Sequence, residues 1–259
     1  METTVQPQAA AMPVASDLTI GDLFRALGAG WRDYRTRPTC GLFFSGIFVA
    51  AGLFLFFILD GRSDMAWLIP AAAGFPILAP FAAAGLYEVS RRIQSGEPIR
   101  WASILTAVRG RGDDQLPLMG VIAFVVFSFW VIIAHGIFGI FLGESGLGAN
   151  WLETLGSGPG LAMLVVGSLI GGAMAFAFFS MTVISFPMLI DREVDFISAT
   201  IVSVRFVRSN LGVMLFWAAM VAVSVFAAMI PLFLGLLVVL PVLGHATWHL
   251  YRRAVDPAI

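Results

Sequence analysis

Forty consecutive residues without a charged side chain, Leu211 to Leu250, constrain this chain more than any other feature. A single α-helix of that length would rise about 60 Å, twice the bilayer's hydrocarbon thickness of about 30 Å. Two membrane-spanning helices fit the block better, with a tight turn near Pro231. We therefore expect spans at residues 211–229 and 232–250.

Four further apolar stretches are long enough to cross a bilayer. They cover residues 40–59, 65–89, 116–142 and 161–190. The chain is 59% hydrophobic and only 12% charged, whereas soluble domains carry about 25% charged residues. The sequence predicts an all-α polytopic membrane protein, with a disordered cytoplasmic tail at residues 1–16 and a single domain of six transmembrane helices at residues 17–259.

The arginines set the expected orientation, because positive charge collects on the cytoplasmic side of membrane proteins. All 15 basic residues are arginines, and the six spans place only Arg62 on one side. The other fourteen fall together on the opposite side: Arg25, Arg32, Arg35, Arg37, Arg91, Arg92, Arg100, Arg109, Arg111, Arg192, Arg205, Arg208, Arg252 and Arg253. Both termini are therefore expected in the cytoplasm.

A segment with helical periodicity precedes each pair of spans. Apolar residues gather on one face of each segment: Ile20, Leu23, Phe24, Leu27 and Trp31; Trp101, Ile104, Leu105 and Val108; Phe196, Ile197, Ile201, Val204 and Val207. Thr19 and Asp22 resemble a capping box at the start of the first segment, and Asp195 is placed to cap the third. We expect three transmembrane hairpins, each preceded by an amphipathic helix at the cytoplasmic membrane interface.

Few residues in the chain offer catalytic or ligand chemistry. There is no lysine, and Cys40 is the single cysteine, so Schiff-base chemistry and cysteine-based metal sites are excluded. His135 is expected near the outer side, far from His245 and His249. The latter two have a spacing that could bind a metal, but Trp248 and Tyr251 beside them favour an interfacial anchor. No metal, cofactor or nucleic-acid site is predicted.

Glu88 is the deepest acidic side chain in the predicted spans. We interpret it as the partner of Arg91 and Arg92, three and four residues further along the helix. The alternative is an ion or proton ligand in a cytoplasmic vestibule. Prolines in the second span, among them Pro76, could kink that helix beside a binding cavity between Pro76 and Glu88.

Several short motifs carry a family resemblance. They are Trp31-Arg32-Asp33-Tyr34, Gly41-Leu42-Phe43-Phe44, Gly74-Phe75 to Pro80-Phe81, Gly85-Leu86-Tyr87-Glu88-Val89-Ser90-Arg91-Arg92 and Gly96-Glu97-Pro98. With them the chain resembles a proteobacterial family of integral membrane proteins catalogued as domain of unknown function 2189. Some members are labelled as similar to cytochrome c oxidase subunit one, but three histidines at unmatched depths cannot supply that redox centre. The resemblance implies a bacterial inner membrane and a functional role for Tyr87, Glu88, Arg91 and Arg92.

The predicted function follows from the missing ligands and the scarcity of buried charge. We expect a non-enzymatic accessory, assembly or structural protein of the inner membrane. Its expected partners are the lipid bilayer and other membrane proteins, with a respiratory complex as one candidate. The alternative is a small-solute or lipid transporter or channel with a proline-kinked second helix.

Overall fold

The computed structural model describes residues 12–59, 83–107, 115–143 and 151–256, and every regular element in these ranges is a helix. Residues 83–95 are also helical. The helices are α1 (Ile20–Thr36), α2 (Pro38–Leu59), α4 (Trp101–Ala107), α5 (Gln115–Leu142), α6 (Trp151–Gly156), α7 (Gly158–Thr182), α8 (Ser185–Asp191), α9 (Phe196–Ser209), α10 (Leu211–Met229) and α11 (Leu236–Val255). The all-α prediction is confirmed.

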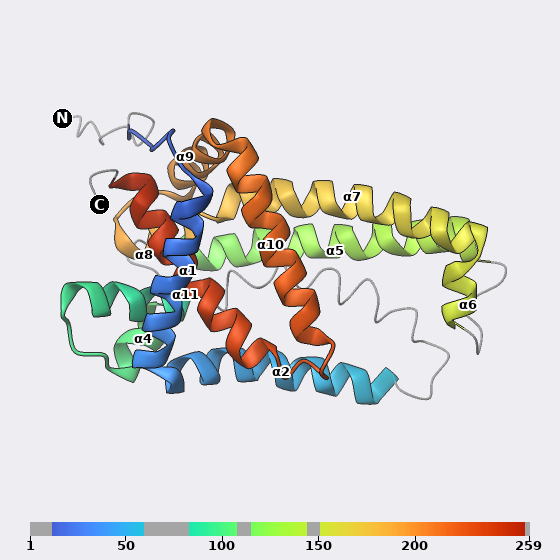
Figure 1. Ribbon diagram of the computed structural model, residues 1–259, viewed down its shortest axis with the longest axis horizontal. Helices are drawn as coiled ribbons and strands as arrows, with labels where there is room; N and C mark the ends of the chain where they lie inside the picture. The colour runs from blue at the N-terminus through green and yellow to red at the C-terminus, as the bar shows by residue number, and fades with distance from the viewer. Residues whose placement is uncertain (1–11, 60–82, 108–114, 144–150, 257–259) are drawn as a thin grey trace, which may run out of the picture.

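Helices α2, α5 and α7 share a direction, and the short helices gather at the two ends. Figure 1 shows α5 and α7 side by side, with α2 running along the opposite edge and α10 and α11 crossing between them. Helices α1, α4, α8 and α9 lie together at one end, and α6 lies at the other. We call the first the arginine-rich end, because the described arginines belong to it.

Three stretches of the described residues are long and apolar enough to cross a membrane: Gly120–Leu142, Gly158–Asp191 and Leu211–Met229. A fourth is counted if the bent pair α1–α2 forms one span. These stretches coincide with the third, fourth and fifth predicted spans, and the fourth candidate, which ends at Phe54, covers most of the first. Most of the second predicted span, residues 65–82, lies outside the described residues. Six spans arranged as three hairpins therefore stay a prediction.

A sharp corner separates α1 from α2. The two helix axes differ by 100°, and the residue between them, Arg37, leaves the helical conformation. Proline disfavours a helical residue before it and is tolerated as the first residue of a new helix, so Pro38 accounts for the break. At its other end α1 begins with the predicted capping box, in which Thr19 Oγ1 accepts from the Asp22 N–H and Asp22 accepts from the Thr19 N–H.

The buried face of α1 is not its most apolar face. It packs on α11 through small and polar residues, namely Asp22, Ala26, Ala29, Gly30 and Asp33, together with Leu23 and Tyr34. Of the five apolar positions expected to share one face, Ile20, Phe24 and Trp31 are exposed. Gly30 permits the close approach, since a Cβ there would lie 2.6 Å from both Ala246 N and Val242 O.

Helix α11 is the centre of the structure. It packs against α1, α2, α8 and α10, and more than half of its residues are buried. The expected turn near Pro231 is present between α10 and α11. Its Leu232 and Phe233 have φ of 50° and 65°, a left-handed conformation that is uncommon for such residues. The sixth predicted span falls on α11, which is not among the candidate spans, because His245, His249, Arg252 and Arg253 make its second half polar.

Two details differ from the sequence-based boundaries. The connector between the third and fourth predicted spans contains the short helix α6. Residues 1–11 of the predicted tail lie outside the described residues, while Ala15 and Leu18 are fixed by Asn210. The Asn210 side chain donates to Ala15 O at 2.8 Å and accepts from the Leu18 N–H at 3.0 Å.

Candidate functional site at the arginine-rich end

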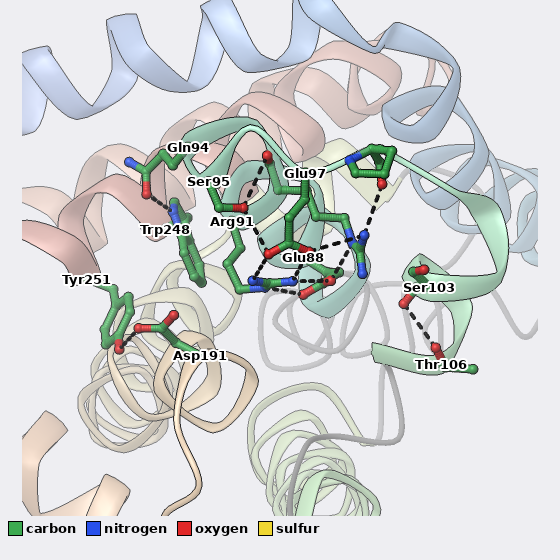
Figure 2. A network of polar contacts seen from close by, with 12 residues as sticks. Glu88, Arg91, Gln94, Ser95, Glu97, Ser103, Thr106, Asp191, Trp248 and Tyr251 are labelled. Atoms are coloured by element: carbon green, nitrogen blue, oxygen red, sulfur yellow. Dashed lines mark hydrogen bonds and ion pairs between the residues drawn. The ribbon is translucent and has the colours of Figure 1, made fainter.

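Glu88, Arg91 and Arg92 form a compact ion cluster with Glu97. Glu88 accepts hydrogen bonds from Arg91 Nε at 2.7 Å, Arg91 Nη2 at 2.9 Å and Arg92 Nε at 2.6 Å. Glu97 closes the cluster by accepting from Arg91 Nη1 at 2.9 Å, and Arg92 Nη1 donates to the Pro98 carbonyl at 2.9 Å (Figure 2). The predicted pairing of Glu88 with both arginines is confirmed.

The charges in this cluster reinforce one another. Hydrogen bonds from Arg91 and Ser95 lower the pKa of Glu97 to about 2, although the carboxyl is exposed. The hydrogen bond to Glu88 raises the pKa of Arg91 above its ordinary value. Glu88 itself is only 4% exposed, and a buried carboxylate needs such compensation, because burial without a partner is costly.

A second, buried chain of polar groups joins three elements. Ser90 Oγ lies 2.7 Å from Asp33 Oδ2 in α1 and 2.7 Å from His245 Nδ1 in α11. The same Asp33 oxygen lies 2.8 Å from His249 Nε2. These contacts link the helix of residues 83–95 to both α1 and α11, so they fix the packing of the arginine-rich end.

The Trp248 side chain determines which atoms donate in this chain of polar groups. Trp248 Nε1 can only donate, so Gln94 Oε1 accepts from it at 2.9 Å (Figure 2) and Gln94 Nε2 donates to His249 Nδ1 at 3.2 Å. His249 Nδ1 therefore carries no hydrogen, and its Nε2–H donates to Asp33. Ser90 gives its hydroxyl hydrogen to the Asp33 carboxylate and accepts from the Nδ1–H of His245.

This assignment leaves one nitrogen without a partner. In a neutral His245 with its hydrogen on Nδ1, Nε2 bears a free lone pair. That atom is buried and makes no hydrogen bond in the part of the chain that the structure describes. The interfacial-anchor interpretation is wrong for His245, which is fully buried between α1 and residues 83–95. Among the described residues no group of three or more histidines, cysteines and acids could hold a metal.

A third set of contacts ties α8 to the end of α11. Asp191 Oδ2 accepts from the Tyr251 hydroxyl at 2.7 Å (Figure 2) and from Arg252 Nη1 at 3.2 Å. Asp256 accepts from Arg252 Nη2 at 2.8 Å. The cap predicted for the third amphipathic segment is also present, with the Asp195 side chain accepting from the Ser198 N–H at 2.9 Å.

Tyr87, the fourth predicted site residue, has a different environment. It lines a cavity of about 90 Å³ between α2, residues 83–87, α7, α10 and α11. The walls are mostly apolar, with hydroxyls from Ser45, Thr182 and Thr247. Trp217 also lines it, and the Nε1–H of this buried side chain has no acceptor within the described ranges.

The structure shows which of the predicted candidate residues lie together. The local motif brings together Glu88, Arg91 and Arg92, and Tyr87 faces the neighbouring cavity instead. Asp33, Ser90, His245 and His249 were not predicted as a group, because Ser90 and His245 are 155 positions apart. In the sequence, these residues stand out only as polar residues on otherwise apolar or closely packed helices.

Comparison with protein families agrees with the membrane assignment. Residues 68–191 match the model of the family described as "Predicted integral membrane protein (DUF2189)", the family that the Gly85–Arg92 motif indicated. The matched region begins after the motifs at residues 31–44, which also carried the resemblance. No curated protein and no solved structure matches the chain.

Proposed function

We propose that the chain is a non-enzymatic protein of the bacterial inner membrane that acts by packing against another membrane protein. Accessory, assembly and structural roles all use this mode, and a respiratory complex is one candidate partner. The distribution of arginines supports a cytoplasmic position for the arginine-rich end and for both termini. The α5–α7 hairpin is the observation that carries the proposal.

Little of the chain that the structure describes covers the hairpin. Only 17% of the most apolar window of α5 and 11% of that of α7 are buried. Large apolar side chains point away from the protein, such as Ile140, which is 80% exposed, and Leu169, which is 70% exposed. In a membrane such a surface contacts either lipid or another protein.

Glycines favour the second possibility. At Gly136 and Gly139 in α5 and at Gly167 and Gly172 in α7, an added Cβ would meet no atom of the described residues within 4 Å. In a helix each glycine costs about 1 kcal/mol of stability relative to alanine, and contact with lipid alone does not offset that cost. Small residues on a membrane helix allow a second helix to approach closely.

The ion cluster supports a structural rather than a catalytic role. Both oxygens of Glu88 accept from arginines, and both arginines have a further acceptor in Glu97 or Pro98. A carboxylate occupied in this way is not free to take a proton from a substrate. The cluster instead holds residues 83–98 in a fixed shape.

Site-specific photocrosslinking tests the proposal. With a crosslinking amino acid in place of Val165, a partner should give one discrete adduct in intact membranes. Gly139→Leu combined with Gly167→Leu should abolish that adduct, whereas Gly46→Leu, at an equally open position in α2, should not. A protein that stays monomeric in mild detergent, with no adduct at Val165, would overturn the proposal.

The cavity favours a second candidate function, transport of a small solute. Its volume of about 90 Å³ is below the ~150 Å³ of a cavity that binds benzene. Tyr87→Phe removes a hydroxyl at the wall and should change solute flux into liposomes. Glu88 does not line the cavity but pairs with Arg91. Glu88→Gln should therefore change the stability of the fold and leave the solute flux of the folded protein unchanged. Equal flux with and without protein would exclude transport.

A further inference from the structure

Apart from Arg205, which also has a partner, the described arginines divide into two groups. Six pair with carboxylates: Arg25, Arg91, Arg92, Arg192, Arg252 and Arg253. In contrast, Arg32, Arg35, Arg37, Arg100 and Arg208 are exposed, and none of their guanidinium groups has a hydrogen bond or ion pair within the described ranges. An unpaired guanidinium has five donors available for an anion.

Three of the unpaired arginines lie at the corner between α1 and α2. Arg32 and Arg35 are in the last turns of α1, and Arg37 is the residue between the helices. A fourth, Arg100, is brought near by the next residue, because the rings of Trp101 and Phe43 pack edge to face with centroids 5.3 Å apart. Phe43 belongs to the first turns of α2. We call Arg32, Arg35, Arg37 and Arg100 the corner arginines.

The surface of α1 has three sectors around its axis. Small and acidic residues face α11. At 100° per residue, the exposed Ile20, Phe24 and Trp31 fall within 40° of one another. Arg25, Arg32 and Arg35 lie beside that apolar strip and away from α11. A helix with protein, apolar and cationic sectors is suited to the boundary between bilayer and water.

The corner gives α1 the right direction for that position. Because the α1 and α2 axes differ by 100°, α1 lies close to the membrane plane wherever α2 runs along the membrane normal. The apolar strip can then enter the acyl boundary while the arginines stay at headgroup level. Trp31 and Trp101, both partly exposed, are the residue type that favours this depth.

We propose that the corner arginines form a binding site for the phosphate groups of anionic phospholipids. Guanidinium groups bind phosphate through paired hydrogen bonds, and the nearby apolar strip selects a phosphate that is attached to acyl chains. The site uses α1, α2 and α4, so it is independent of the α5–α7 surface proposed for a protein partner.

Lipid titration of the purified full-length protein in neutral detergent tests the site. Thermal unfolding followed against added phosphatidylglycerol should show saturable stabilisation that weakens at high salt. Phosphatidylcholine and glycerol 3-phosphate at the same concentrations should have little effect. Equal stabilisation by phosphatidylcholine would show a general lipid effect, and equal stabilisation by glycerol 3-phosphate would show a free-phosphate site; either result would overturn the proposal.

Variants assign the effect to these side chains. The triple change Arg32→Gln, Arg35→Gln and Arg37→Gln should weaken phosphatidylglycerol binding on the order of 100-fold, at about fivefold per arginine. Replacing the same three by lysine should retain only part of the binding, because an ammonium group keeps the charge but cannot form the paired hydrogen bonds. Arg25→Gln is the matched control, since Arg25 is on the same helix but already pairs with Asp22. Unchanged lipid binding by a folded triple variant would contradict the proposal.

Discussion

Gly30 in α1 packs directly against the backbone of Ala246 in α11. A Cβ at residue 30 would lie 2.6 Å from the Ala246 nitrogen and 2.6 Å from the Val242 oxygen. Because backbone atoms of two helices cannot give way as a side chain can, this contact sets the distance between α1 and α11. The buried contacts of Asp33 with His249 and Ser90 depend on that distance.

Gly30→Ala should therefore separate α1 from α11. We expect a loss of about 1–3 kcal/mol, the usual cost of overpacking, measured as thermal or denaturant unfolding in detergent. Gly28→Ala is the matched control, because its nearest neighbour would be the flexible Arg32 side chain at 3.9 Å. Alanine favours a helix over glycine, so the control should keep or raise the stability. An equal change in stability for the two variants would show that Gly30 is not closely packed against α11.

Ser90→Ala tests the buried chain of polar groups around Asp33. The change removes the donor to Asp33 and the acceptor for His245, and both partners stay buried. We expect a loss of about 1–3 kcal/mol in the free energy of unfolding. The exposed Ser95 lies on the same helix, and Ser95→Ala should cost only a few tenths of that amount. An unchanged free energy of unfolding in Ser90→Ala would mean that Ser90 does not contact Asp33 and His245.

Glu88→Gln tests the ion cluster. Glu88 is 5% exposed in its side chain, and Arg91 and Arg92 are 11% and 15% exposed, so loss of the charge leaves two guanidinium groups poorly compensated. We expect a loss of about 3 kcal/mol. A double-mutant cycle with Arg91→Gln should give a clear coupling energy, whereas additive effects of the two changes would rule out a direct interaction.

Acid should weaken the same cluster through Glu97. The pKa of this carboxyl falls from 4.5 to about 2 in the folded protein. Its contribution to stability is therefore complete above pH 4.5 and is lost as the pH falls toward 2. Glu97→Gln should flatten the pH dependence of the unfolding midpoint over this window. Glu193→Gln, at an exposed carboxylate outside the cluster, should keep the wild-type dependence.

Hydropathy predicted the long helices because α5, α7 and α10 are apolar on every side. The turn near Pro231 was predictable for a related reason, since Leu211 to Leu250 is too long for one span. The role of α11 was not predictable in this way. Its second half has the polar residues His245, His249 and Arg252, and their partners are far away in the sequence.

The contact face of α1 shows why apolar periodicity was an incomplete guide. In a soluble protein Ile20, Phe24 and Trp31 would face the core, but in a membrane the lipid is apolar as well. The faces that meet inside this protein are marked instead by Gly30, Ala26 and the hydrogen-bonded Asp33. In the candidate site, likewise, the pairing of Glu88 with Arg91 was local and predictable, and the contact of Ser90 with His245 was not.

Cysteine labelling gives the most direct test of the claim that the arginine-rich end faces the cytoplasm. Cys40 is the single cysteine and is buried, so Cys40→Ala provides a background for Arg35→Cys, Ser209→Cys and Leu152→Cys. An impermeant maleimide should label the first two only in inside-out membrane vesicles and the third, on α6, only in spheroplasts. Labelling of Arg35→Cys and Leu152→Cys from the same side would contradict the proposed arrangement.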